Sequence, residues 1–357
     1  MIAVHCGAGH YSPKLYSDYK KLCRRACKKG MQEMQNKGTA VDAVKAAVMV
    51  LENNPLTNAG CGSNLTLEGE VECDASLMDG DSLLYGACGA VKTVKNPIAL
   101  AYEVYQKQRE PQPLGLVAPT LVVGKGAQNY AKFRGIEFIS NKKLVTMRAL
   151  KQFRRYKHWV DAYKQEELDS VCIKNDETKA LLDTVGAVCI DDTGQIAAAC
   201  SSGGLVLKQP GRVGQAGVFG GGVWADSYDK NHETSLGVCT SGCGEHLVQT
   251  QLAKVIAEDL ISSVCPTTDL YESLNQKFLN SRYLRNVHQK MCGALVLRRD
   301  IKSKEISLLW GHSTDSMALG YMTKDDSVGK GIISVLPTEA AEGLSINIGG
   351  TCYYPRD

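Results

Sequence analysis

The sequence predicts a mixed α/β fold in which helices and sheets are stacked in layers. Helical and strand-like segments occur in blocks, and the strict strand-helix alternation that builds a doubly wound sheet is absent. Glycine-rich turns are frequent, but neither GxxxxGK(S/T) nor GxGxxG stands between a strand and a helix. We therefore expect stacked layers, no nucleotide site and no cofactor.

The N-terminal part predicts a buried strand and two helices. Residues 2–5 form a short apolar run that leads into a glycine turn at 7–9. From Ser17, apolar residues recur at helical spacing beside basic ones and predict an amphipathic helix: Tyr19, Leu22, Cys23 and Ala26. Thr39 and Asp42 resemble a capping box before an Ala/Val run, which predicts a second, buried helix.

The middle of the chain is irregular. Residues 51–76 are dense in Pro, Asn and Gly and then alternate, which predicts a long ordered loop feeding strands. Asn96-Pro97 marks a helix start. Apolar periodicity weakens over 141–183, a candidate mobile loop, and the basic cluster at 151–158 is interpreted as a solvated helix face or as a nuclear-import or nucleic-acid patch.

After residue 183 the chain consists mainly of short apolar or Gly/Ala-rich runs separated by turn residues. These predict strands of a buried sheet: TVGAVCI, QIAAAC, AGVFGGGVWAD, TSLGVCT, CGALVLR, EISLLW and MALGYM. Between the fourth and fifth, residues 244–262 carry apolar residues on one helical face, which predicts one helix.

Composition excludes several classes of protein. The 357 residues are 44% hydrophobic, enough for a large core, and the formal charge of +3 predicts neither a nucleic-acid nor a membrane surface. The 14 cysteines are too few for a disulfide scaffold. No apolar stretch reaches the ~18 residues of a membrane span, and no signal peptide is visible, so we expect a soluble protein that is not secreted.

Chemistry by elimination points to the bond between Asp183 and Thr184. GxSxG and HExxH are both absent, which removes two common hydrolase designs. What remains is DTVGAV, where a polar loop end meets a buried strand. Its simplest interpretation is an ordinary strand start.

DTVGAV, SSGGLVLKQPGRVGQ and SGCGE resemble the N-terminal-nucleophile asparaginase family, together with HCGAG, LENNPLTNAGCGSNL and CDASLMDG. The similarity runs over almost the whole chain, and within the family it is strongest to the threonine aspartases, or taspases. The resemblance implies a four-layer αββα sandwich that forms one structural domain. It also implies self-cleavage into an α-subunit of 1–183 and a β-subunit of 184–357, and pairing of two such heterodimers.

The resemblance makes Thr184 the nucleophile. A threonine hydroxyl is weak until a base takes its proton, and a chain break before Thr184 would supply an α-amino group with a pKa near ~7.7–8.0. Ser202 is then expected to hydrogen-bond the nucleophile, and Ser241 and Gly242 to form the oxyanion hole. In both hydroxyl positions serine replaces the family's usual threonine.

Substrate contacts also follow from the resemblance. Arg212 matches the arginine that binds a substrate carboxylate, and we expect it to pair with Asp183 in the uncleaved chain. Gln215 stands where asparaginases of free amino acids carry an aspartate for the α-ammonium, which favours an endopeptidase that cleaves after aspartate. Asn64, Gly9 and Lys20 are weaker candidates, and for Lys20 the solvated face of a helix is the simpler interpretation.

No metal is assigned to the catalytic site, although the loop 51–62 resembles one that holds a structural sodium in the family. The expected partners are protein substrates with an aspartate cleavage site. The family points to nuclear regulators, such as trithorax-type histone methyltransferases and the transcription factor IIA precursor, and so to nucleus and cytoplasm. The alternatives are an asparaginase or isoaspartyl dipeptidase of small substrates, a lysosomal glycosylasparaginase, which would need secretion, and an unprocessed binding scaffold.

Overall fold

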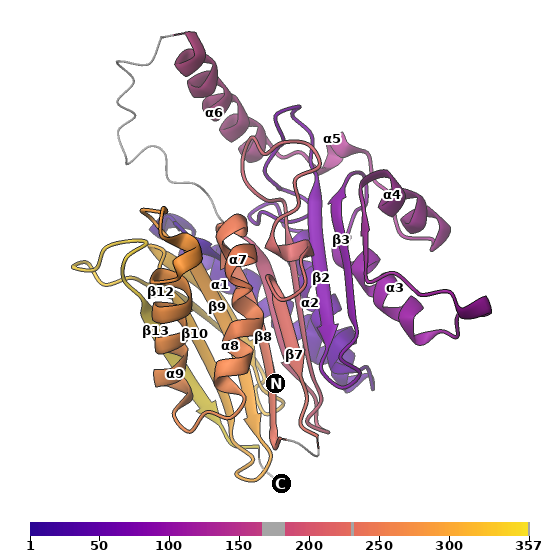
Figure 1. The fold of residues 1–357 in the computed structure, drawn as a ribbon, viewed down its shortest axis with the longest axis vertical. Helices are drawn as coiled ribbons and strands as arrows, with labels where there is room; N and C mark the ends of the chain where they lie inside the picture. Colours follow the sequence, from indigo (N-terminus) through magenta and orange to yellow (C-terminus); the bar gives the residue numbers. More distant parts are fainter. Residues whose placement is uncertain (166–182, 230–231, 356–357) are drawn as a thin grey trace.

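Two β-sheets pack face to face and helices cover both outer faces (Figure 1). The computed structural model describes residues 1–165, 183–229 and 232–355. Separate apolar cores fill the space under α1–α3, the space between the sheets, and the space under α7–α9. The predicted αββα sandwich is confirmed.

The larger sheet has eight strands and is antiparallel except where β3 meets β4. In spatial order its strands are β12 (Lys330–Val335), β11 (Ser316–Met322), β1 (Ile2–Gly9), β5 (Val185–Ile190), β6 (Ile196–Ser202), β2 (Cys73–Asp79), β3 (Tyr85–Val91) and β4 (Leu121–Val123). The β1 strand continues through the expected turn at 7–9, because a bulge after His5 absorbs the irregular backbone.

The smaller sheet has five antiparallel strands. In spatial order they are β13 (Asn347–Tyr353), β10 (Ile306–His312), β9 (Cys292–Asp300), β8 (Thr234–Gly242) and β7 (Val223–Asp226). Of the expected run AGVFGGGVWAD only the last four residues form a strand, and its start folds into the 3₁₀ helix η3 (Gln215–Gly217).

Of the helices that cover the larger sheet, the first three begin where the sequence predicts, and the fourth was not predicted. They are α1 (Tyr16–Gln35), α2 (Ala40–Glu52), α3 (Pro97–Arg109) and α4 (Gly124–Phe133). Thr39 and Asp42 form both bonds of the predicted capping box, and Pro97 opens α3.

The helices on the smaller sheet are α7 (Gly244–Thr250), α8 (Leu252–Leu260) and α9 (Pro266–Glu272), and a π-helical turn, Ser273–Leu279, follows. One continuous helix over 244–262 was expected. Gln251 separates α7 from α8 because its φ of 47° is left-handed and cannot continue a helix.

The prediction of a mobile loop over 141–183 is wrong for the first part of that range. Residues 141–165 contain α5 (Asn141–Leu144) and α6 (Met147–Gln165), because Leu144 and Ala149 bury themselves against Leu65, Val71 and Cys73. The basic cluster 151–158 lies on α6, which projects from the body of the molecule (Figure 1). The rest of the predicted loop, 166–182, lies outside the described residues. Within the described residues no helix is both long and apolar enough to cross a membrane.

Candidate active site

Thr184 lies directly before β5. The β5–β6 register pairs Val185 with Ser201, which places Thr184 beside Ser202. Thr184 Oγ1 donates to Ser202 Oγ over 3.3 Å, and Ser202 Oγ also accepts from the Gly204 N–H over 3.0 Å. Thr184 is only 2% exposed, so its hydroxyl is held in one protein environment.

Ser241 reaches the site from the other sheet. Its Oγ lies 3.3 Å from the Thr184 backbone nitrogen and accepts that N–H, and it also accepts the N–H of Ala8 over 2.9 Å. In the intact chain the Thr184 nitrogen is a peptide amide and stands in for the α-amino group of a cleaved chain. Ser241 therefore contacts the nitrogen that the sequence predicts to act as the base.

Gly242 ends β8 in a conformation that needs glycine. Its φ is 139°, and an added Cβ would lie 2.3 Å from the carbonyl oxygen of Met291. Gly242 lines a small pocket together with Thr184 and Ser202; the other lining residues are Asn58, Gly204, Leu205, Arg212, Gln215 and Gly244. Five of the predicted site residues thus meet in one pocket.

Gln215 makes the shorter of the two hydrogen bonds described for the Thr184 hydroxyl. Its Nε2 donates to Thr184 Oγ1 over 2.7 Å, and the residue is buried at the start of η3. Because the amide is neutral, it fixes the hydroxyl without placing a negative charge in the pocket.

Arg212 does not pair with Asp183, contrary to expectation. Its Nε and Nη2 donate to the two carboxylate oxygens of Glu245 over 2.8 and 2.7 Å, a bidentate pair at the rim of the pocket. The exposed fraction of the Arg212 side chain is 15%, against 48% for Glu245. The pairing was missed because Glu245 lies on α7, 33 residues away.

Two acidic residues at the start of β2 hold the turn that carries Arg212. Asp74 accepts the N–H groups of Gly214 and Ala90 over 2.9 and 2.8 Å, and Glu72 accepts the Gly211 N–H over 2.7 Å. For Asp74 the sequence signal was CDASLMDG, which the family resemblance included but to which it gave no role; Glu72 lies one residue before this motif.

Asn64 borders the site through the backbone. Its Nδ2 and that of Asn58 both donate to the Gly204 carbonyl, over 2.8 and 2.9 Å, and its backbone N–H donates to Asn58 Oδ1 over 2.8 Å. Asn58, which the sequence did not single out, lines the pocket at Thr184 as well as a second one beside Asp183.

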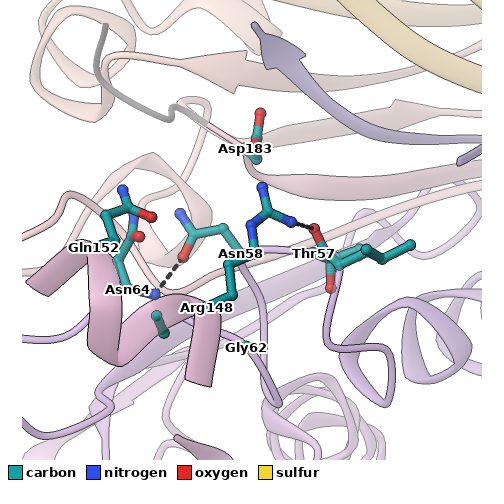
Figure 2. Close-up of a pocket in the computed structure, with 9 residues that line it drawn as sticks. Thr57, Asn58, Gly62, Asn64, Arg148, Gln152 and Asp183 are labelled. Atoms are coloured by element: carbon teal, nitrogen blue, oxygen red, sulfur yellow. Dashed lines mark hydrogen bonds between the residues drawn. The ribbon is translucent and has the colours of Figure 1, made fainter. Parts of the chain in front are cut away.

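Asp183 lines a second pocket (Figure 2). Arg148, Ala149 and Gln152 of α6 form one wall. Asp183 is 3% exposed, and burial raises the pKa of its carboxyl to about 6, although the Arg148 guanidinium and the Tyr11 hydroxyl oppose that rise. Asp183 thus shares a pocket with residues of α6 and not with Arg212.

Two weaker candidates lie away from Thr184. Lys20 is on α1 with its backbone against Gly331 of β12, three strands from β5 in the sheet order. Gly9 pairs with Ser316 at the end of β1, and it lines neither pocket. Gly7 makes the closer approach, because an added Cβ there would lie 2.6 Å from the Asp183 Cα.

His5 lies buried beside Gly186, whose added Cβ would be 2.4 Å from the His5 Nε2. Burial lowers the pKa of His5 to about 3, and neither ring nitrogen has a hydrogen-bond partner among the described residues. An imidazole with so low a pKa is a poor proton acceptor. The described residues also contain no group of three or more His, Cys, Asp and Glu side chains suited to a metal ion, and the sodium expectation for the 51–62 loop stays a prediction to which we assign no step.

A comparison with protein families decides the broad class. The family profile described as "Asparaginase" matches residues 1–329, which is most of the chain. The chain belongs to the asparaginase family.

Curated relatives agree with this membership. The chain is 38% identical over 260 residues to a protein from Bos taurus named isoaspartyl peptidase/L-asparaginase, covering 71% of this chain and 75% of that protein. The human protein of the same name is 38% identical over 257 residues, with 71% and 75% covered. A plant-type L-asparaginase of Thermococcus kodakarensis is 36% identical over 276 residues, with 72% and 78% covered. This chain therefore has the αββα sandwich fold and is a hydrolase of the N-terminal-nucleophile type.

Proposed function

We propose that this asparaginase-family hydrolase uses Thr184 as its nucleophile, cuts its own chain before that residue, and then cleaves protein substrates after aspartate, as taspases do. Gln215 carries the proposal. It donates to the Thr184 hydroxyl at the position where, by the family resemblance, enzymes that act on free amino acids place an aspartate. A neutral amide offers no charge to a substrate α-ammonium group, whereas a peptide chain has no ammonium group at that place.

Self-cleavage starts from the intact chain. Thr184 Oγ1 attacks the carbonyl carbon of Asp183, the C–N bond breaks, and the proton of the hydroxyl ends on the released amine. Water then hydrolyses the ester, which leaves a carboxylate on Asp183 and restores the Thr184 hydroxyl. The products would be subunits of 1–183 and 184–357 that remain one structural domain.

Substrate cleavage would repeat the same steps on another chain. The freed α-amino group of Thr184 has an ordinary pKa near ~7.7–8.0, so part of it is neutral at pH 7 and accepts the hydroxyl proton. Ser241 Oγ, 3.3 Å from that nitrogen, orients it. Gly242 in the same pocket would offer its N–H to the oxygen that becomes negative.

An asparaginase or isoaspartyl peptidase is the second candidate. The names of the curated relatives favour it, and Arg212 at the pocket rim has the planar fork that binds a free carboxylate. Glu245 already occupies that fork, however, and a small substrate would have to displace it.

Wild type and Thr184→Ala, compared on a denaturing gel with N-terminal sequencing of the fragments, test the nucleophile. We expect two fragments from wild type, the smaller beginning at Thr184, and one intact chain from the variant. An intact wild-type chain would contradict the whole proposal.

Processed wild type should then be given peptides with an internal aspartate, matched peptides with asparagine, free asparagine and isoaspartyl dipeptides. Cleavage of the aspartate peptides alone supports the endopeptidase. Ammonia from asparagine, or dipeptide hydrolysis without cleavage of internal aspartate, would instead support the second candidate.

The remaining parts of the proposal concern the cellular setting. Protein substrates with an aspartate site would be the partners, including nuclear regulators, with the enzyme in nucleus and cytoplasm. Two processed heterodimers would associate.

A further inference from the structure

The start of α6 places a second arginine, Arg148, near the Asp183–Thr184 bond. Arg148, Ala149 and Gln152 line the pocket that contains Asp183, and Figure 2 shows the Arg148 side chain rising from the helix toward Asp183. Burial of Ala149 against the β2 side of the molecule fixes this end of the helix. The wall of the pocket is therefore anchored.

The Arg148 guanidinium is held on one edge. Nη1 donates to the Leu56 carbonyl over 2.9 Å and to the Tyr19 hydroxyl oxygen over 3.2 Å. A guanidinium has five N–H donors in a rigid fork, and the hydrogen bonds that the structure describes for Arg148 leave from Nη1 alone. The remaining donors are available for a carboxylate.

Asp183 is the carboxylate that shares the pocket. Its Oδ1 is buried and has no hydrogen-bond partner among the described residues, and the same holds for the Gln152 Nε2 in the opposite wall. The cavity volume is ≈ 10 Å³, about the room for one water molecule. An orphaned acceptor and an orphaned donor thus belong to residues that line the same pocket, and a small side-chain movement would be needed to join them.

We propose that Arg148 and Gln152 form a carboxylate-binding subsite that positions Asp183 for self-cleavage. This inference rests on the proposed function and adds the residues that recognise the aspartate before the bond. Both are positioning residues, because they act on the side chain of Asp183 and not on the reacting carbonyl.

The backbone of Asp183 is tightly packed, so its position depends on how its side chain is held. Gly7 packs directly against the Asp183 Cα on one side, so only the carboxylate end of the residue remains to be fixed. Holding it aligns the Asp183 carbonyl with the Thr184 hydroxyl, and small misplacements of reacting groups cost large factors in rate.

Among the described residues Arg148 is the cation whose charge acts on the Asp183 carboxyl, and the two share one pocket without forming an ion pair. Tyr11, Tyr19 and Cys6 also interact with the carboxyl. Burial raises the pKa of the two tyrosines, and the hydrogen bond with Cys23 together with burial raises that of Cys6, so all three stay neutral near pH 7. The charge complement of Asp183 therefore comes from α6.

A double-mutant cycle on self-cleavage tests the proposal. Freshly made Arg148→Ala should process about 10- to 100-fold more slowly than wild type. Arg148→Lys keeps the positive charge but loses the planar guanidinium, so its processing rate should lie between those of wild type and Arg148→Ala. Arg154→Ala, an exposed arginine on the same helix, is the control and should process normally.

The cycle is closed by repeating Arg148→Ala in an Asp183→Asn background. We expect Arg148→Ala to slow processing much less in that background, because the neutral amide at position 183 has no charge for a cation to stabilise. An equal slowing in both backgrounds would mean that Arg148 only supports the fold, and the proposal would be overturned.

A second measurement separates this proposal from the proposed function. In the uncleavable Thr184→Ala chain, the pKa of Asp183 measured by NMR should rise when Arg148→Ala is added and stay unchanged with Arg154→Ala. An unchanged pKa with Arg148→Ala rejects the subsite, whereas an intact wild-type chain with the expected pKa change rejects the self-cleavage and keeps the pairing.

Discussion

The side-chain amide of Gln215 donates a 2.7 Å hydrogen bond to the hydroxyl oxygen of Thr184. The nucleophile is thus fixed by a neutral group, while the nearest cation of the pocket, Arg212, is neutralised by Glu245. Small charged substrates find few free charges in such a pocket. This relationship separates the two candidate functions most clearly.

Gln215→Asp should move activity from peptides toward small substrates. The new carboxylate would bind an α-ammonium group, so hydrolysis of asparagine or isoaspartyl dipeptides should rise while cleavage at internal aspartate falls. Gln215→Asn shortens the side chain equally but adds no charge. It should therefore show only the decrease in cleavage at internal aspartate. An equal gain in both variants would attribute the change to size.

Glu245→Gln should release Arg212 for a free carboxylate. Charge-assisted hydrogen bonds contribute about 1.5–3 kcal/mol, so KM for substrates with a free α-carboxylate should fall about tenfold or more. Glu258→Gln, which removes an exposed carboxylate paired with Lys254 on α8, is the matched control. Unchanged KM values would show that Glu245 does not restrict the pocket.

Gly242→Ala should impair both folding and activity. The new Cβ would meet the Met291 carbonyl at 2.3 Å with φ at 139°, and such backbone strain costs about 1–3 kcal/mol. Thermal melting and self-cleavage rates measure the two effects. Gly126→Ala, where an added Cβ meets nothing within 4 Å, should leave both nearly unchanged.

Stability of the uncleavable Thr184→Ala chain should fall as pH rises through about 6. Burial raises the Asp183 pKa from 3.8 to about 6, so the folded state favours the protonated acid. Its contribution is complete below pH ~4, the pKa of an unfolded aspartate, and is lost as pH rises through the folded value. The loss is about 3 kcal/mol.

Adding Asp183→Asn to that chain should remove this part of the pH dependence. Glu52, whose pKa burial raises to about 7, contributes in the same direction in both chains and cancels in the difference. Identical melting curves against pH would contradict the raised pKa of Asp183.

Local patterns predicted much of the scaffold. The capping box at Thr39 and the helix start at Pro97 depend on neighbouring residues alone, and both are confirmed. The predicted grouping around Thr184 came from the family resemblance, and the structure brings Ser202, Ser241, Gly242, Arg212 and Gln215 to its pocket or its hydrogen bonds. Their catalytic roles stay predictions.

The failures involve contacts between distant segments. Arg148 precedes Asp183 by 35 positions, and no sequence pattern around either residue predicts that they share a pocket. The weak periodicity of 141–165 likewise concealed α6, because the apolar side chains that this helix packs into a core, among those described, lie in its first turns. The partner of Arg212 came from α7 for the same reason.

The order of strands in the larger sheet determines what a cut before Thr184 could achieve. Strand β1, from the first 183 residues, lies between β11 and β5, and β2 pairs with β6, so strands from before and after the bond interlock. A cleaved chain would stay a single particle in native mass spectrometry and come apart only in denaturant. The cut would then create a new chain end inside a molecule whose two pieces have no route to separate without unfolding.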